Sequence, residues 1–189
     1  IKASDPEFKG HLAPVPMAVR GVRQYETEPV STQSGICLWM LENICCRFHR
    51  VVKKLLERHE SRPTLEITDE YDVQDLLHAI LRLDFGDIRR EEWTPSYAGG
   101  ASRIDLILKN EGVLIEVKKT GANIREKEIG DQLIVDIEHY KEYPGVSTLV
   151  CFIYDPDQWI ENPEGLKDDL ERQSTENINV EVIICPKAD

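Results

Sequence analysis

The order of apolar patterns along the chain predicts an α/β fold in which helices flank a mixed β-sheet. Two segments with apolar residues at helical spacing come first, three short strand-like segments follow, and helix-like and strand-like segments then alternate. Consecutive short strands favour antiparallel pairing, whereas strand–helix–strand units favour parallel neighbours. The chain has 189 residues, which fits one domain with a sizeable core.

The helices are predicted from apolar spacing and from the residues that interrupt it. They cover 38–58, 69–83, 124–143 and 163–173. Pro63 breaks the chain after the first helix, Asp69 is the expected N-cap of the second, and Pro144 ends the third. The first helix and the residues before it form an N-terminal helical extension over 17–63, and the remaining core is expected over 64–189.

The strands are predicted over 90–94, 103–108, 113–118, 146–154 and 177–185. The first has the weakest pattern. The apolar run 146–154 is short enough for a strand that is buried on both faces. The last strand alternates apolar and polar residues, which is typical of one buried face.

The second and third strands form a predicted β-hairpin with two chemically distinct faces. One face holds Ile104, Leu106, Leu108, Val113, Ile115 and Val117, and the other holds Arg103, Asp105, Glu116 and Lys118. Because the apolar residues must face one core, the turn between Leu108 and Val113 must have an even length. That register places Asp105 opposite Glu116.

Two carboxylates in this position require an explanation. Directly opposite side chains have Cβ atoms ~4.5–5.5 Å apart, so Asp105 and Glu116 repel each other in a poorly solvated site. A hard divalent cation such as Mg²⁺ would convert that repulsion into ligation. Lys118 points to the same face and could act on an attacking water or on phosphate charge. A solvated sheet face, on which these residues form cross-strand ion pairs, is the structural alternative. The spacing of Asp105, Glu116 and Lys118 alone does not exclude it.

Composition limits the class of protein. Hydrophobic residues make up 41% and charged residues 31%, as in soluble globular proteins, and no apolar run approaches the ~18–20 residues of a membrane span. The five cysteines include no C-x-x-C pair, so free thiols in a reducing cytoplasm are expected. Residues 1–16 lack periodicity and precede Met17. A vector-derived leader and a natural disordered arm explain them equally well.

The charge of the chain is uneven. A net charge of −12 argues against a general nucleic-acid coat protein. Segment 47–62 nevertheless carries six basic and two acidic side chains, a net charge of +4, whereas 155–189 carries a net charge of −7. The basic segment could meet a polyanion, but charge alone favours a solvated helix face.

With these motifs the sequence resembles the PD-(D/E)XK nuclease superfamily. Asp105 matches the aspartate of that motif, and Glu116-Val117-Lys118 matches its E-x-K. The segments "DEYDVQDLLHAIL", "SRIDLIL", "IEVKKT" and "DQLIVDIEHY" resemble the branch of GATC-cutting type II restriction enzymes. The residue before Asp105 is Ile104 rather than proline, which departs from the motif. The resemblance implies a restriction-endonuclease-like fold for the core.

The resemblance also implies an activity, namely a metal-dependent endonuclease that hydrolyses DNA phosphodiester bonds as a bacterial restriction or defence effector. Asp105 and Glu116 would hold Mg²⁺, with Mn²⁺ as a substitute and the Val117 carbonyl as a further ligand. Lys118 would complete the catalytic set. Glu70, in the helix before the hairpin, would add a ligand, although an acid in a first helical turn also stabilises the helix dipole.

The resemblance extends to partners. Lys119, Arg103, Gln132 and Arg125 are the expected DNA contacts. Cutting both strands favours a homodimer, and the acidic chain favours a further domain or partner protein for targeting. No membrane partner is expected. Two alternatives stay open: a non-catalytic nucleic-acid-binding or interaction module that keeps the nuclease fold, and a nuclease that acts on RNA or branched DNA.

Overall fold

Helices and strands follow one another in the predicted order. The computed structural model describes residues 31–93, 103–141 and 143–187. The elements are α1 (Ser31–Leu56), the 3₁₀ helix η1 (His59–Ser61), α2 (Glu70–Leu81), β1 (Ile88–Trp93), β2 (Arg103–Leu108), β3 (Val113–Lys119), α3 (Glu126–Tyr140), β4 (Thr148–Tyr154), α4 (Pro163–Glu171) and β5 (Asn179–Cys185). The predicted leader or arm over 1–16 lies outside the described residues.

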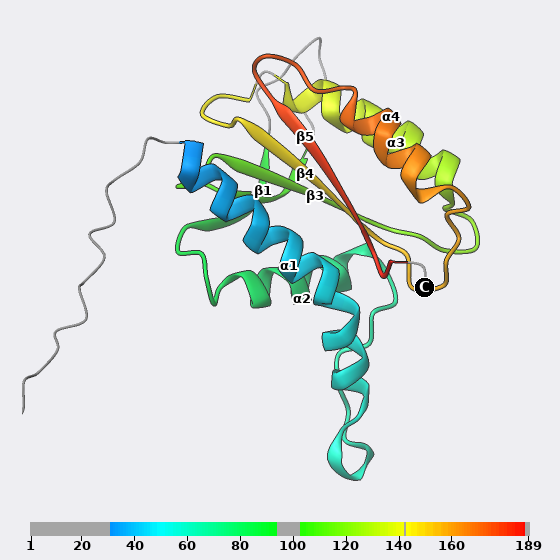
Figure 1. Ribbon diagram of the computed structural model, residues 1–189. Coiled ribbons are helices and arrows are strands. Elements are labelled where there is room, and N and C mark those ends of the chain that lie inside the picture. The colour runs from blue at the N-terminus through cyan, green and yellow to red at the C-terminus, as the bar shows by residue number, and fades with distance from the viewer. Residues whose placement is uncertain (1–30, 94–102, 142, 188–189) are drawn as a thin grey trace, which may run out of the picture.

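The five strands form one mixed sheet with the order β1-β2-β3-β4-β5. The pairs β1–β2 and β2–β3 are antiparallel, and β3–β4 and β4–β5 are parallel. Helices α1 and α2 cover one face, and α3 and α4 cover the other (Figure 1). The predicted α/β class, with a mixed sheet between helices, is therefore confirmed.

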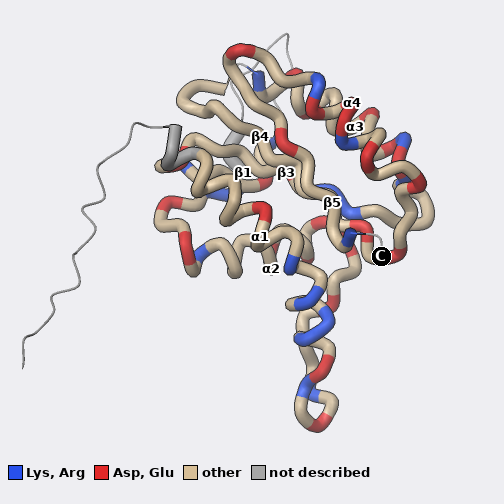
Figure 2. Tube along the Cα trace, in the orientation of Figure 1, with Lys and Arg blue, Asp and Glu red and all other residues tan. Residues whose placement is uncertain are grey.

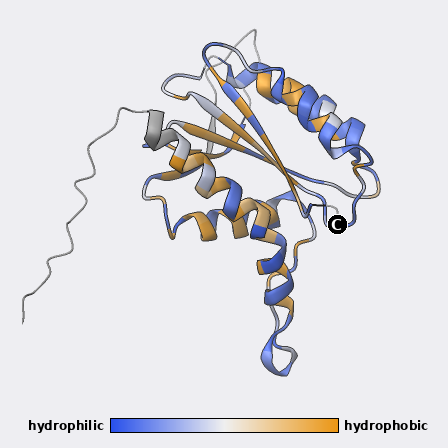
Figure 3. Cartoon of the chain, in the orientation of Figure 1, coloured by the Kyte–Doolittle hydropathy of each residue, from blue (hydrophilic) through white to orange (hydrophobic). Residues whose placement is uncertain are grey.

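Each face of the sheet has its own hydrophobic core. In the core beneath α1 and α2, Phe48 packs edge-on against Phe152 and Tyr154, with ring centroids 5.3 and 5.1 Å apart. The apolar sides of these two helices face the sheet (Figure 3). The core beneath α3 and α4 centres on Leu114, Leu133 and other fully buried side chains. All five cysteines are free thiols, as expected.

The hairpin has the predicted register, since Leu108 pairs with Val113. The ladder continues to Leu106–Ile115 and has no further pair beyond it. One prediction about its faces was wrong, because Ile104 packs with Leu114 in the core under α3 and not with Leu106 under α2. The alternation of β2 is interrupted where its pairing with β3 ends, so residues on either side of Asp105 no longer follow one regular ladder.

The start of α2 is fixed by a capping box. The Asp69 carboxylate accepts a hydrogen bond from the Asp72 backbone N–H at 3.1 Å, and the Asp72 carboxylate accepts one from the Asp69 N–H at 3.2 Å. The predicted N-cap is therefore confirmed. Its role in the molecule is to fix where α2 begins, and hence where the first residue of that helix, Glu70, lies.

Replacing Asp69 by alanine is expected to lower the free energy of unfolding by about 1 kcal/mol, because the Asp72 backbone N–H loses its side-chain acceptor. Urea denaturation followed by circular dichroism measures the change. The matched control is Asp84→Ala, which removes an exposed acid beyond the other end of α2. Equal stability of the two variants would show that the cap contributes nothing.

Candidate active site

Strands β2 and β3 separate at Asp105, and a group of charged side chains gathers there. Asp105 is half-buried, and its Oδ2 accepts a hydrogen bond from the Val117 backbone N–H at 2.8 Å. The N–H and C=O of one strand residue point to the same neighbour, so the Val117 carbonyl is also directed toward β2. Asp105 Oδ1 has no hydrogen-bond partner within the described residues.

Glu116 and Lys118 form a buried ion pair on the side of β3 that faces α3. Lys118 Nζ donates to Glu116 Oε1 at 2.5 Å and lies 3.0 Å from Asp136 Oδ2 of α3. The Tyr140 hydroxyl, also on α3, donates to Glu116 Oε2 at 2.8 Å. Glu116 is only 4% exposed and Lys118 only 7%, so these contacts replace water almost completely.

Glu70 completes the group from the other face of the sheet. It is the first residue of α2 and is partly buried. Burial raises the pKa of Glu70 to about 7, the charges of Asp105 and Asp136 add to that rise, and Lys118 opposes it. These mutual effects place Glu70 within electrostatic range of the hairpin carboxylates.

The electrostatics of this group reflect burial and an excess of negative charge. Burial raises the pKa of Asp105 to about 6, against the opposing hydrogen bond from Val117. Burial and the charge of Asp105 also raise the pKa of Glu116 well above its ordinary value. Burial alone would lower the pKa of Lys118, but the charges of the surrounding carboxylates outweigh it and hold that pKa above its usual range.

We refer to Glu70, Asp105, Glu116, Lys118 and Asp136 as the acidic cluster. Four carboxylates here share a single ammonium group, so the arrangement is short of positive charge. Carboxylate and carbonyl oxygens are the donors that Mg²⁺ and Mn²⁺ prefer. The side chains therefore suit a hard divalent cation, although the described residues contain no group of three or more His, Cys, Asp or Glu side chains already arranged to hold a metal ion.

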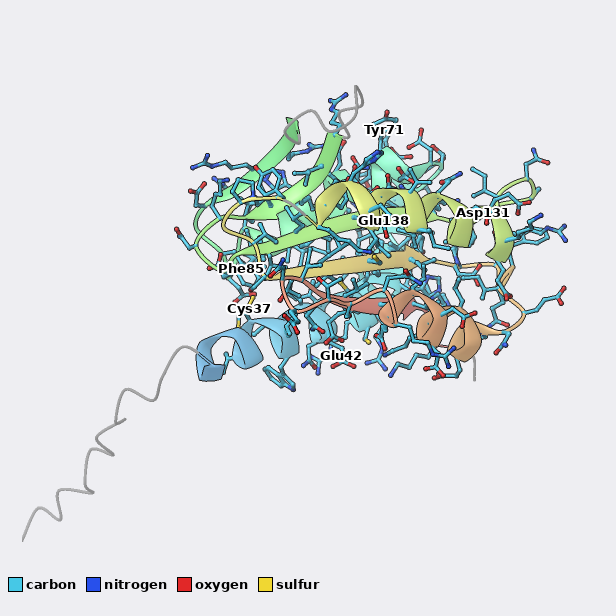
Figure 4. The ribbon with its side chains drawn as sticks, turned by 90° about the horizontal axis from the view of Figure 1, so that it is seen from above. Cys37, Glu42, Tyr71, Phe85, Asp131 and Glu138 are labelled. Carbon is cyan, nitrogen blue, oxygen red and sulfur yellow. The ribbon has the colours of Figure 1, made fainter. Side chains whose placement is uncertain are left out.

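The predicted DNA-contacting residues are only partly brought to the cluster. Gln132 lines an open depression on α3 together with Lys118 and Asp136. Arg103 is exposed, and its charge lowers the pKa of Asp105, so it lies nearby. Lys119 follows Lys118 in β3, so the two side chains point to opposite faces of the sheet. Its Nζ donates to the Thr120 carbonyl at 3.3 Å. Figure 4 shows α3 above the sheet, with Asp131 of the same depression labelled.

The fourth predicted DNA contact, Arg125, lies elsewhere. Its guanidinium group stacks over the Trp159 ring at 4.6 Å from the ring centroid, and its backbone N–H donates to Glu128 at the start of α3. None of these contacts links it to the cluster. The guanidinium group of Arg125 is instead held by its cation–π contact with the loop residue Trp159.

Two features of the site were missed in the sequence. Asp136 was not among the predicted site residues, yet its carboxylate lies 3.0 Å from the Lys118 ammonium. The available signal was its helical spacing, since Gln132, Asp136 and Tyr140 follow one face of α3. The second feature is a buried hydrogen bond from the Thr120 hydroxyl to Asp155 at 2.6 Å, which ties the ends of β3 and β4 together.

Comparison with known proteins gives one match. The family model of the DpnII-MboI restriction endonucleases (REase_DpnII-MboI) matches residues 39–187. That range includes most of α1, the complete sheet and every residue of the acidic cluster. Searches of curated proteins and of solved structures returned no match. Among the residues that the structure describes, no helix is both long and apolar enough to cross a membrane.

Proposed function

The chain belongs to the DpnII-MboI restriction endonuclease family, and from that premise we propose that it hydrolyses DNA phosphodiester bonds with a divalent metal ion at the acidic cluster. The observation that carries this proposal is the buried Lys118 ammonium between Glu116 and Asp136, beside Asp105, at the point where β2 and β3 separate. A solvated sheet face would not bury these groups. We extend the proposal to a cytoplasmic restriction or defence role.

Asp105, Glu116 and the Val117 carbonyl would hold Mg²⁺ or Mn²⁺, with Glu70 as a further ligand. When bound, such an ion supplies Lewis-acid stabilisation of phosphate charge. Asp105 keeps one oxygen for this role while the other stays fixed by the Val117 N–H. Tyr140 holds the Glu116 carboxylate in place through its hydroxyl group.

Lys118 is the residue that would act on the attacking water and on phosphate charge. In the metal-free protein its raised pKa keeps it protonated, so it begins as a hydrogen-bond donor. Neutralising the carboxylates around it would remove the cause of that rise and bring its pKa down. Asp136 Oδ2 lies 3.0 Å from the Lys118 ammonium and so helps to keep Lys118 oriented toward the cluster.

A plasmid assay tests the proposal directly. The protein is incubated with supercoiled plasmid, single-stranded DNA or RNA in Mg²⁺, Mn²⁺ or EDTA, beside Glu116→Gln. We expect metal-dependent cleavage of plasmid that falls about a hundredfold or more in the variant, because Glu116 would be a ligand of the metal. A linear product without a persistent nicked form would favour a homodimer with two sites.

The matched control is Glu164→Gln, the same change at an exposed position on α4. It is expected to cleave as the parent does. Cleavage by Glu116→Gln at the rate of the control, or cleavage that persists in EDTA, would exclude the acidic cluster as a metal-dependent site. Cleavage of RNA alone would move the proposal to a different substrate.

A further inference from the structure

The C-terminal end of α1 projects from the body of the protein together with the segment that follows it (Figure 1). Within this region we call residues 47–62 the basic arm. It carries a net charge of +4 in a chain of −12. Beyond Val52 no described side chain is fully buried until Val73, and in the outer half of the arm only Leu55 packs, partly buried, against the core under α1 and α2. Figure 2 shows that basic residues recur along this projection.

Most cations of the basic arm have no ionic partner. Lys54 pairs with Glu57 at 2.7 Å, and Arg62 lies 3.5 Å from Glu60. Within the described residues, no carboxylate forms an ion pair with the remaining four basic side chains, which are all exposed. These are Arg47, Arg50, Lys53 and Arg58. An unpaired cation can bind an anion without first breaking a contact within the protein.

The basic arm and the acidic cluster are joined by a short stretch of chain. Arg62 is followed after eight residues by Glu70, where α2 begins. The arm therefore leaves the body on the side where α2 starts (Figure 1), and Glu70 at that start belongs to the cluster. A polyanion held along the arm would pass close to the cluster.

The arm also has a spacing that suits an extended polyanion. Arg47 and Lys53 are six residues apart on α1, a rise of about 9 Å, and Arg50 lies between them. Such a row can contact successive phosphates of one strand. A compact acidic ligand would need only one or two of these cations, whereas DNA carries a charge every ~3.4 Å along each strand.

We propose that the basic arm binds the phosphate backbone of duplex DNA and holds the duplex beside the acidic cluster. This inference rests on the proposed function. It explains how a strongly acidic chain gains affinity for a polyanion, because local phosphate neutralisation supplies sequence-independent binding. The contacts position the duplex and carry no information about its sequence.

The test compares two triple variants of the full chain. The arm variant is Arg50→Ala/Lys53→Ala/Arg58→Ala. The control is Arg82→Ala/Lys167→Ala/Arg172→Ala, which removes the same residue types from α4 and from the C-caps of α2 and α4. Binding of a fluorescein-labelled duplex is measured in EDTA by anisotropy over a range of salt concentrations. Cleavage kinetics are measured in Mg²⁺, and thermal unfolding verifies that both variants fold.

We expect the arm variant to bind about a hundredfold more weakly at low salt, and the slope of log K against log salt to fall by about 2.7 as three phosphate contacts are lost. Its KM should rise while kcat at saturating DNA stays unchanged. If parent, control and arm variant bind and cleave alike, the arm proposal is overturned and the proposed function stands. If the parent neither binds nor cleaves DNA, the proposed function fails and the arm proposal fails with it.

Discussion

Replacing Asp105 by asparagine is expected to abolish cleavage and, in metal-free buffer at about pH 8, to raise the free energy of unfolding. Under the proposed function, the loss of cleavage follows because Asp105 would be a charged metal ligand. The gain in stability follows because the folded protein forces a desolvated carboxylate to stay ionised next to Glu116. Asparagine has nearly the same shape, and its Oδ1 can still accept the hydrogen bond from Val117 that Asp105 accepts now.

The size of the gain follows from the pKa of Asp105, which rises from 3.8 to about 6. A rise of about 2 pKa units corresponds to at most about 3 kcal/mol of destabilisation when the group is ionised. A raised pKa means that this contribution favours the folded state below about pH 4 and is lost as pH rises through about 6. The advantage of Asp105→Asn should therefore be small in acid and largest above pH ~7.

Thermal and urea unfolding with and without Mg²⁺ measure this effect. Mg²⁺ should stabilise the parent, because it binds the folded state alone, and should leave Asp105→Asn unchanged. Asp168→Asn, an exposed acid on α4, is the matched control and should respond to Mg²⁺ like the parent. An Asp105→Asn protein that still cleaves DNA, or that gains stability from Mg²⁺ like the parent, would remove Asp105 from the metal site.

The parts of the molecule that could be predicted from the sequence depend on short spacings. The register of β2 and β3 follows from the alternation of apolar residues across an even turn, and the start of α2 follows from Asp69 and Asp72. Both features are decided within a few residues, so no knowledge of tertiary packing is needed. The grouping of Glu116 and Lys118 on one face of β3 follows from the same alternation, and both side chains contact α3.

The parts that could not be predicted depend on how helices lie against the sheet. Asp136 meets Lys118 only because α3 crosses that face of β3, and Ile104 changes core only because β2 and β3 separate at Asp105. Tyr140 has two interpretations, core packing and a role in the site, which its position in the sequence does not separate. It is 1% exposed and also donates to Glu116, so both interpretations hold.

Because the cluster is buried, loss of Asp105 and loss of Lys118 should change the free energy of unfolding in opposite directions. Among the described contacts Asp105 forms no ion pair with Lys118, so its removal relieves repulsion with Glu116, whereas removal of Lys118 leaves Glu116 and Asp136 without their cation. An excess of carboxylates that would bind a cation is expected to lower the free energy of unfolding when no cation is bound. Asp105→Asn and a Lys118 variant should both lose activity. Comparing their free energies of unfolding can therefore separate an active site from a structural ion-pair network.

Replacing Lys118 by methionine, which keeps an unbranched chain, is expected to lower cleavage by about 10²–10⁴-fold. It should also lower the free energy of unfolding by about 3–5 kcal/mol at neutral pH, because Glu116 loses its buried partner. The sign is opposite to that of Asp105→Asn. In the variant, the pKa values of Glu116, Asp105 and Glu70 should rise further, since the charge of Lys118 now lowers all three.

Those rises set the pH dependence of the Lys118→Met variant. Protonation of the carboxylates removes the unpaired charge, so its instability should shrink as pH falls toward about 4 and be greatest above the raised pKa values. Glu116→Gln in the same chain should recover part of the loss, and the double-mutant cycle gives the coupling energy of the pair. Independent, additive effects of the two changes on unfolding would mean that Lys118 does not compensate Glu116, and that its buried ammonium is held by Asp136 instead.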